Sequence, residues 1–361
     1  MQPEKPRCVD LQEVTRSARR AVVTGGAGFL GSWLCELLLA EGWDVVCADN
    51  FLTGDADNVA HLSRERSFTL EERDVCDEWD VPGPVDLVLH LASAASPVSY
   101  LRHPVATMRA GSHGTYNALE LARRRGARFL LTSTSEVYGD PLEHPQRETY
   151  WGTVNPIGPR SVYDESKRFA EALTYSYRRQ GLVDARAVRI FNTYGPRMAV
   201  DDGRVVPTFL AQALTGRPMT VAGDGEQTRC LCFASDTTRG VLAAALSDHP
   251  GPFNIGSSHE LTMLELAEAV RTVCSSRSTI VHTEAAEDDP RIRRPDLSRT
   301  ANDLGWEPQV ALHDGLRRTA DWLSSSGRLD DPVAEPVGAL IGVAGPGRPG
   351  TWSGPPRPTI T

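Results

Sequence analysis

A glycine-rich segment near the N-terminus constrains the fold of this chain more than any other feature of its sequence. Residues 21–31 read AVVTGGAGFLG, so an apolar run leads directly into glycines spaced three apart: Gly25, Gly28 and Gly31. The run before Gly25 is typical of a buried strand, and helical spacing begins at Phe29. Such glycines allow a tight turn and close packing of the helix on the sheet. The segment therefore predicts a strand–turn–helix unit of a parallel α/β sheet.

The same turn is suited to binding phosphates. The first helical turn, with Phe29 and Leu30, presents backbone N–H groups and a partial positive charge, and Gly28 lets a pyrophosphate approach the backbone. A glycine pattern alone is weak evidence, but here the next predicted strand ends at Asp49. An acidic side chain there accepts hydrogen bonds from the adenosine ribose of a dinucleotide. The combination predicts a dinucleotide cofactor.

The acidic residues around this strand end indicate which dinucleotide is bound. The 2′-phosphate of NADP would meet the Asp49 carboxylate, and Asp55 and Asp57 follow with no cation nearby in the sequence, so we expect NAD. A simple turn at Asp49-Asn50 is the alternative without a function. Further cofactor contacts are expected at Asn50, directly after Asp49, and at Leu91 and Ala92, at the end of a strand predicted over 85–92. Asp74 and Val75, after a third strand that we expect between these two, are placed to meet the adenine. For Asp74, a strand-end acid without a role explains the sequence equally well.

Strand-like and helical patterns alternate through the first half of the chain. Short runs rich in Val, Leu and Ile indicate buried strands at residues 20–24, 44–49, 85–92, 128–133 and 185–191. Helical spacing lies between them at residues 29–41, 104–125 and 161–180. This alternation predicts an α/β fold with a Rossmann-type, doubly wound parallel sheet.

Beyond residue 192 the pattern loosens, and we expect a smaller, mixed C-terminal substrate domain. Helical segments beyond residue 192 are predicted at residues 205–215, 237–247, 262–274 and 313–324. We assign residues 19–192 and about 229–257 to the NAD-binding domain, and 193–228 and about 258–325 to the substrate-binding domain. Residues 1–18 are expected to be loose, and 326–361, rich in Pro and Gly without periodicity, to be a disordered tail.

Charge and composition exclude several kinds of partner. The formal net charge of −9 argues against nucleic acid, whose phosphates need a basic surface. No apolar run approaches the length of a membrane span, so we expect no membrane partner and a cytoplasmic location. Of the seven cysteines only Cys230 and Cys232 lie close together, and they lack further ligands nearby, so we expect reduced thiols and no metal site.

Tyr163 and Lys167 form the clearest candidate for chemistry. They are four residues apart and hence on one face of the helix predicted at 161–180. Tyrosine titrates near pH ~10, and a neighbouring ammonium and a positive nicotinamide both favour the phenolate. The chain has only two lysines, Lys5 and Lys167, against an abundance of arginine. A lysine at this position therefore indicates a chemical role more strongly than a surface helix residue.

The loop after the strand at 128–133 reads TSTSEVYGD over residues 132–140. Ligands bind at the carboxyl ends of strands in open α/β sheets. We expect Thr134 to hydrogen-bond the reacting hydroxyl, with Ser135 and Glu136 beside the substrate. A polar turn without chemistry is the alternative for each, and Ser135 is the weakest assignment.

Together these motifs resemble UDP-glucuronic acid decarboxylases, the UDP-xylose synthases, within the extended short-chain dehydrogenases. The resemblance runs from about residue 20 to 325 and rests on TGGAGFLG, STSEVYGDP, YWGTVNPIGPRSVYDESK, RIFNTYGPRM, DDGRVV and GWEP. It implies that Tyr163 removes the 4-hydroxyl proton of a nucleotide-linked glucuronate while NAD takes a hydride. The resulting 4-keto sugar loses its carboxylate as an enolate stabilised by Tyr163 and Thr134. Protonation and hydride return then give the nucleotide-linked xylose and regenerate NAD, with UDP-glucuronate as the expected substrate.

The resemblance also assigns residues that no local pattern identifies. It places Glu136 and Arg229 at the sugar carboxylate and the 5-position, Arg229 and Arg294 at the diphosphate, and Asn192 at a sugar or phosphate group. Taken alone, the run RIRR at 291–294 is a solvated basic segment, and the resemblance favours Arg294 over Arg293. Related enzymes dimerise through the helices matching 104–125 and 161–180, which implies a homodimer.

Three positions depart from the family pattern, and two rival functions stay open. Gly111 stands in place of Asn, Ala222 in place of a Tyr near the base, and Phe233 in place of Tyr. Gly111 and Gly114 predict a distorted helix, and Ala222 leaves uridine- and thymidine-linked sugars as alternatives. The chain could instead be a 4-epimerase or 4,6-dehydratase, although Ser135 replaces the acid that dehydration requires. A catalytically silent NAD-binding regulator is the remaining alternative.

Overall fold

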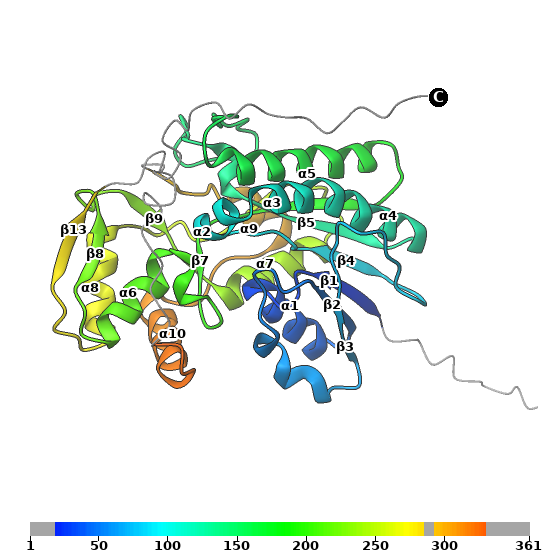
Figure 1. The fold of residues 1–361 in the computed structure, drawn as a ribbon. Coiled ribbons are helices and arrows are strands. Elements are labelled where there is room, and N and C mark those ends of the chain that lie inside the picture. The colour runs from blue at the N-terminus through cyan, green and yellow to red at the C-terminus, as the bar shows by residue number, and fades with distance from the viewer. Residues whose placement is uncertain (1–18, 285–291, 330–361) are drawn as a thin grey trace, which may run out of the picture.

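Seven parallel strands form the central sheet of the chain (Figure 1). The structure, a computed structural model, describes residues 19–284 and 292–329, so residues 1–18 and 330–361 of the expected termini lie outside it. In spatial order the strands are β11 (Phe253–Ile255), β6 (Ala185–Ile190), β5 (Arg128–Thr134), β4 (Leu87–His90), β1 (Arg20–Thr24), β2 (Asp44–Asp49) and β3 (Phe68–Glu72). The predicted α/β, doubly wound parallel sheet is confirmed.

The strand order reverses between β1 and β4, and this reversal positions the site. Val22 of β1 lies opposite Val46 of β2 on one side and Val88 of β4 on the other. The chain therefore leaves the carboxyl ends of β1 and β4 in opposite directions, which opens a crevice at that edge of the sheet.

Helices cover both faces of the sheet (Figure 1). On one face, Leu34 of α1 (Phe29–Ala40) and Val241 of α7 (Ala234–Leu246) share a core with the strands. On the other, Leu119 of α4 (Thr115–Arg125) and Ala170 of α5 (Ser161–Arg179) do the same. Because both faces are covered, the central strands are apolar throughout, which is why their positions could be predicted from short Val- and Leu-rich runs.

The helix predicted over residues 104–125 is interrupted. It consists of α3 (Pro104–Arg109), a π-helical turn η3 (Ala110–Gly114) and α4. A Cβ added to Gly111 would lie 2.6 Å from the Cβ of Ser166, so glycine is what lets this turn pack against α5. The distortion expected from Gly111 and Gly114 is confirmed, and it lies beside the helix that carries Tyr163.

The remaining chain builds a second core beyond the sheet. Leu210, Leu266 and Leu316 pack together there, on α6, α8 and α10. The helices of this core are α6 (Val205–Leu214), α8 (Met263–Val273) and α10 (Leu312–Ser325), with the 3-10 turn η5 (Val200–Asp202). Elsewhere in the chain lie α2 (Pro97–Arg102), α9 (Ser298–Leu304) and the 3-10 turns η1 (Ala56–Asn58), η2 (Ala60–Arg64) and η4 (Ser135–Tyr138). The short strands are β7 (Thr193–Tyr194), β8 (Met219–Ala222), β9 (Thr228–Cys230), β10 (Cys232–Phe233), β12 (Glu260–Thr262) and β13 (Ile280–Thr283).

These small strands form three two-stranded sheets, β7 with β10, β9 with β12, and β8 with β13. The helices predicted beyond residue 192 correspond to α6, α7, α8 and α10. Neither α2 nor α9 had a clear sequence pattern. The division into two domains at the residues given above stays a prediction. Within the described ranges, no helix combines the length and the apolar character that crossing a bilayer requires.

Candidate active site

A cavity of about 1800 Å³ opens along the carboxyl ends of the strands. Its lining includes nearly every residue predicted for the site: Gly25, Gly28, Phe29, Leu30, Gly31, Asp49, Asn50, Asp74, Val75, Leu91, Ala92, Thr134, Ser135, Glu136, Tyr163, Lys167, Asn192 and Arg229. Arg294 is not among the described residues that line it, and Arg293 is. The fold therefore brings residues from β1 to β9 to one cavity.

The glycine turn has the geometry that its sequence predicts. Gly25 has a φ of +69°, and a Cβ on it would lie 2.8 Å from the backbone nitrogen of Ala92. A Cβ on Gly31 would lie 2.0 Å from the carbonyl oxygen of Gly25, so α1 can pack this closely only without one. Gly28 is the N-cap of α1, and no side-chain hydrogen bond caps this helix end. Its N–H groups therefore face the cavity as an anion site.

Asp49 lies across this turn at the end of β2. Its carboxylate accepts hydrogen bonds from the backbone N–H of Ala27 at 3.0 Å and of Phe51 at 2.9 Å. Burial raises the pKa of Asp49, and these backbone hydrogen bonds act in the opposite direction. A carboxylate has further lone pairs to offer to ribose hydroxyls. The uncapped helix, the side-chain-free turn and Asp49 together fit a dinucleotide such as NAD.

One part of the sequence argument for NAD was wrong. Asp55 was expected to have no nearby cation, but Arg328 forms an ion pair with it and also lines the cavity. The contact could not be read from the sequence, because the two residues lie far apart in the chain. Arg328 follows α10, and Asp55 follows β2. Asp49 itself remains without an arginine among its hydrogen-bond partners in the described residues.

A smaller polar contact lies where the sequence predicted the adenine of the cofactor. Asn50 donates to the Asp74 carboxylate at 3.3 Å, and Asp74 also accepts the backbone N–H of Cys76 at 2.8 Å. These bonds lower the pKa of Asp74 against the opposing effect of burial. Asp74 is therefore held ionised in a turn, so a structural role and a cofactor contact are both consistent with its place.

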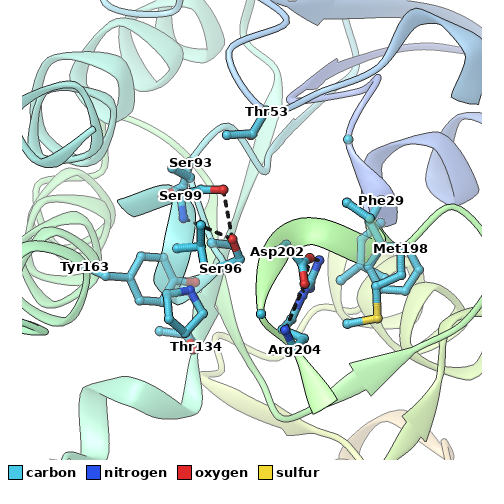
Figure 2. A pocket seen from close by; sticks show the side chains of 18 of the residues that line it. Phe29, Thr53, Ser93, Ser96, Ser99, Thr134, Tyr163, Met198, Asp202 and Arg204 are labelled. Carbon is cyan, nitrogen blue, oxygen red and sulfur yellow. Dashed lines mark hydrogen bonds and ion pairs between the residues drawn. The ribbon is translucent and has the colours of Figure 1, made fainter. Parts of the chain in front are cut away.

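The ring of Tyr163 is held between two groups. It stacks on Tyr100 with centroids 5.3 Å apart and an interplanar angle of 6°, and the ammonium of Lys167 lies 5.9 Å from its centroid. Figure 2 shows Thr134 beside the Tyr163 ring in the cavity. Lys167 donates from Nζ to the carbonyl oxygen of Thr132 at 2.9 Å, which places it under the end of β5.

Burial dominates the acidity of this pair. It raises the pKa of Tyr163, the charge of Glu136 adds to that rise, and hydrogen bonding with Thr134 opposes it. Burial also lowers the pKa of Lys167 to about 8. The chain's own groups thus favour the protonated phenol, and the positive nicotinamide is the charge that would shift the balance toward phenolate.

Glu136 is fixed by two arginines. Arg160 donates to it at 2.9 Å, and both terminal nitrogens of Arg293 donate to its two oxygens. Burial opposes ionisation, but Arg293 and Arg160 outweigh it and lower the pKa of Glu136 to about 2. Glu136 is therefore an anchored carboxylate and not a proton donor near neutral pH.

Arg293 and Arg160 are the main residues that sequence reasoning missed. Arg293 is buried, whereas the Arg294 side chain is 40% exposed and lies 3.9 Å from Glu260. The backbone of Arg294 bonds to Gln146, so the segment runs extended and successive side chains point to opposite sides. Alternation along an extended segment is the signal that would have favoured Arg293.

The far wall of the cavity carries a further ion pair. Asp202, at the end of η5, accepts from Nε of Arg204 at 2.6 Å, and the Arg204 guanidinium lies 5.6 Å from the ring centroid of Phe29. Figure 2 shows this pair across the cavity from Tyr163. Arg229, on β9, is buried and donates to the carbonyl oxygen of Thr228 at 2.8 Å.

Comparisons with known proteins identify the family of this chain. The model of the NAD dependent epimerase/dehydratase family matches residues 21–256. UDP-glucuronic acid decarboxylase 1 of Arabidopsis thaliana is 52% identical over 305 residues, which cover 84% of this chain and 70% of the relative. UDP-glucuronic acid decarboxylase 6 of the same plant is 49% identical, with 87% of this chain and 91% of the relative covered.

A solved structure extends the similarity to the fold. UDP-glucuronic acid 4-epimerase from Bacillus cereus, in complex with UDP-glucuronic acid and NAD, is 26% identical and covers 85% of this chain and 99% of its own, with a TM-score of 0.74. The resemblance stated from the motifs is confirmed by these matches. The chain therefore belongs to the NAD dependent epimerase/dehydratase family.

Proposed function

We propose that this chain is a carboxy-lyase that converts UDP-glucuronate to UDP-xylose with a tightly bound NAD that is regenerated in each turnover. The observation that carries the proposal is the meeting of Tyr163, Lys167 and Thr134 with the glycine turn in one cavity. Similar relatives named UDP-glucuronic acid decarboxylases support the choice of substrate.

Residues at the strand ends would hold the cofactor. The N-terminus of α1 would bind the pyrophosphate, and Asp49 the adenosine ribose. Lys167 would hydrogen-bond the nicotinamide ribose from its place under β5, and the contacts at the adenine would come from Asn50, Asp74 and Val75. When bound, NAD accepts a hydride from the sugar and later returns it.

The first chemical step belongs to Tyr163. Its phenolic oxygen takes the proton of the sugar 4-hydroxyl as that carbon is oxidised, with Thr134 hydrogen-bonding the same oxygen. The stacked Tyr100 ring and the Lys167 ammonium keep the phenol oriented. The product of this step is a 4-keto sugar whose carboxylate is β to the new ketone.

Loss of the carboxylate then needs only a place for the electron pair. The 4-keto oxygen takes up the charge as an enolate, which hydrogen bonds from Tyr163 and Thr134 stabilise. Carbon dioxide leaves, and the 5-position gains one proton. The hydride then returns to C4 while Tyr163 gives its proton back to the 4-oxygen, which yields the pentose. Glu136 and Arg229 would act at the carboxylate and the 5-position, with Ser135 beside the sugar.

The state of Glu136 weighs against dehydration. Elimination of water needs an acid to protonate the leaving hydroxyl. Glu136 is held ionised by Arg160 and Arg293, and its neighbour Ser135 carries a hydroxyl, which is not an acid near neutral pH. The solved UDP-glucuronic acid 4-epimerase shares the fold, so 4-epimerisation is the rival that product analysis must separate.

Nucleotide recognition would fall to the substrate side of the cavity. Asn192 and Arg229 line it, and we propose that they bind the sugar and diphosphate. Arg294 lies outside the lining, so its contact with diphosphate would require its exposed side chain to turn inward. Ala222 and Thr283 end β8 and β13, and Gln227 donates to the Ala222 carbonyl oxygen at 2.8 Å. All three line the cavity, and we propose that the base binds there.

We also propose a homodimer and a cytoplasmic location. Val105 and Met108 on α3, Tyr116 on α4 and Phe169 on α5 are all exposed apolar or aromatic side chains on the outer helical layer. Burying such a face against a second copy is the usual explanation for it.

Product analysis tests the proposed function. The purified chain is incubated with NAD and UDP-glucuronate labelled with ¹³C in the carboxyl group, with the thymidine counterpart in parallel. We expect labelled carbon dioxide and a nucleotide pentose, with uridine or thymidine preference read from the two rates. A uronate or a dehydrated hexose as product, with the label retained, would replace this proposal by epimerisation or dehydration.

A further inference from the structure

Asp164 is a buried carboxyl that the proposed reaction does not use. It follows Tyr163 in the first turn of α5, and only 6% of its surface is exposed. Its Oδ1 atom has no hydrogen-bond partner among the residues that the structure describes. A buried carboxylate oxygen without a partner is costly, so its presence beside the site calls for an explanation.

The groups around Asp164 form a compact charge cluster. Arg160, which precedes α5, and Arg293, from the segment before α9, both act on it electrostatically, as do Glu136 on η4 and Glu165 on its own helix. The phenols of Tyr100 on α2 and of Tyr163 face the same cluster. The Tyr100 hydroxyl is also buried without a hydrogen-bond partner in the described residues.

The charges of this cluster balance in only one protonation state. Arg160 and Arg293 supply two positive charges, and Glu136 is held ionised between them. With Asp164 ionised, Arg160, Arg293, Glu136 and Asp164 are neutral overall. Glu165 is left out of this balance, because its side chain is 36% exposed and pairs with Arg168. With Asp164 protonated, they carry one net positive charge, which would match one incoming carboxylate. Arg160, Arg293 and Glu136 line the cavity, so a ligand in it is within reach of their field.

Asp164 can change its protonation state near neutral pH, and with it the net charge of the cluster. Burial, with help from the charge of Glu136, raises the pKa of Asp164 to about 7, while Arg160 and Arg293 act in the opposite direction. An extra negative charge nearby therefore favours the protonated form.

We propose that Asp164 is a charge-compensating positioning residue, which takes up one proton from solvent when a sugar carboxylate binds beside Arg160 and Arg293. The proton returns to solvent when a product without a carboxylate occupies the site. This inference rests on the proposed function, because it assumes a uronate ligand. It makes recognition of the uronate depend on pH, whereas a neutral sugar such as that of UDP-xylose binds without proton uptake.

The direction of the pH effect follows from linkage. Above neutral pH the unliganded Asp164 is ionised and must gain a proton on binding, so the affinity for UDP-glucuronate falls as pH rises. We expect its Kd to rise about tenfold from pH 6 to pH 8. The Kd of UDP-xylose should change far less, because its sugar brings no charge to the cluster.

Calorimetry measures the proton directly. The NAD-loaded Tyr163→Phe protein, which should not turn over, is titrated with UDP-glucuronate in two buffers of different ionisation enthalpy. We expect uptake of about 0.8 proton per site at pH 8 and about 0.1 at pH 6, and none with UDP-xylose. In the same background, Asp164→Asn should abolish the uptake and leave the Kd independent of pH, while Asp164→Glu should restore an uptake.

A neighbouring carboxylate provides the control. Glu165→Gln changes the adjacent, half-buried residue, which pairs with Arg168, and should keep the uptake. Binding of UDP-xylose shows that each variant is folded. Uptake that persists in Asp164→Asn, or UDP-glucuronate binding without uptake at pH 8, overturns the assignment even if the wild type decarboxylates. Uptake through Asp164 in a chain that releases no carbon dioxide supports it and contradicts the proposed reaction instead.

Discussion

Arg293 donates hydrogen bonds from both of its terminal nitrogens to the Glu136 carboxylate, although 157 positions separate the two residues in the chain. The contact joins the segment before α9 to η4, which directly follows β5. Arg160, at the start of α5, forms a second ion pair with the same carboxylate. The segment before α9 is thereby linked to the candidate site residues that follow β5.

Replacing Arg293 tests this tie. We expect Arg293→Ala to lower kcat/KM by about 10² or more and to destabilise the fold by roughly 3 kcal/mol, because it leaves part of a buried carboxylate unpaired. Arg293→Lys keeps the charge but loses the bidentate geometry, so it should recover part of the lost kcat/KM and part of the lost stability. Steady-state kinetics and denaturant unfolding measure the two effects. As a control, Arg294→Ala changes the neighbouring, exposed arginine, and an equal loss in that variant would contradict the account.

The buried Lys167 predicts a dependence of stability on alkaline pH. Its pKa is lowered to about 8 by burial, against 10.5 in a model compound, so between these values the unfolded chain binds more protons than the folded one. Stability should therefore rise with pH in this window. From pH 7.5 to 9.5 we expect the wild type to gain about 2 kcal/mol relative to Lys167→Met. Urea unfolding at both pH values measures this, and parallel curves for the two proteins would contradict it.

The Asp55–Arg328 pair predicts a change in cofactor selectivity. With Asp55 removed in Asp55→Ala, Arg328 loses its partner and becomes available to the 2′-phosphate of NADP. We expect the ratio of NADP to NAD affinity to rise about tenfold, and the double variant Asp55→Ala/Arg328→Ala to lose that gain. Fluorescence titration with each dinucleotide measures it. No change in the ratio would mean that Arg328 does not reach the ribose.

The π-helical turn predicts a specific steric coupling. A Cβ at Gly111 would lie 2.6 Å from the Cβ of Ser166 and 2.9 Å from its carbonyl oxygen. Gly111→Ala should therefore cost about 1–3 kcal/mol and slow turnover, because it pushes against the helix that carries Tyr163. Adding Ser166→Gly removes one of the two contacts and should recover part of the loss. Thermal unfolding of the single and double variants measures the coupling, and strict additivity would contradict it.

The sheet, and the candidate pair Tyr163 and Lys167 in the cavity, could be predicted from the sequence because both depend on local patterns. The boundaries of β1 and β2 were predicted residue for residue, since buried parallel strands are short apolar runs between clear breaks. The edge strand β3 is largely exposed and carries Leu70 toward solvent, so no continuous apolar run marks its boundaries. The small strands β7 and β10 have two residues each and exist only through tertiary pairing.

The missed parts of the site share a different cause. Arg293 and Arg328 reach the cavity from segments far along the chain, and neither has a periodic pattern around it. Tyr100 could not be predicted as a site residue, because α2 is only six residues long and has no clear sequence pattern. Its ring nevertheless stacks on that of Tyr163, the candidate base. Contacts between distant segments depend on the packing of two cores, which no local spacing encodes.

The reaction run in deuterium oxide tests the central claim, that Tyr163 drives a reversible oxidation at C4 that permits decarboxylation. With UDP-glucuronate, we predict a UDP-pentose with one solvent deuterium at C5 and none at C4, and no net reduction of NAD. Tyr163→Phe should lower kcat by about 10³ or more while the NAD content stays the same. Deuterium at C4, accumulation of NADH equal to product, or full turnover by Tyr163→Phe would contradict the account.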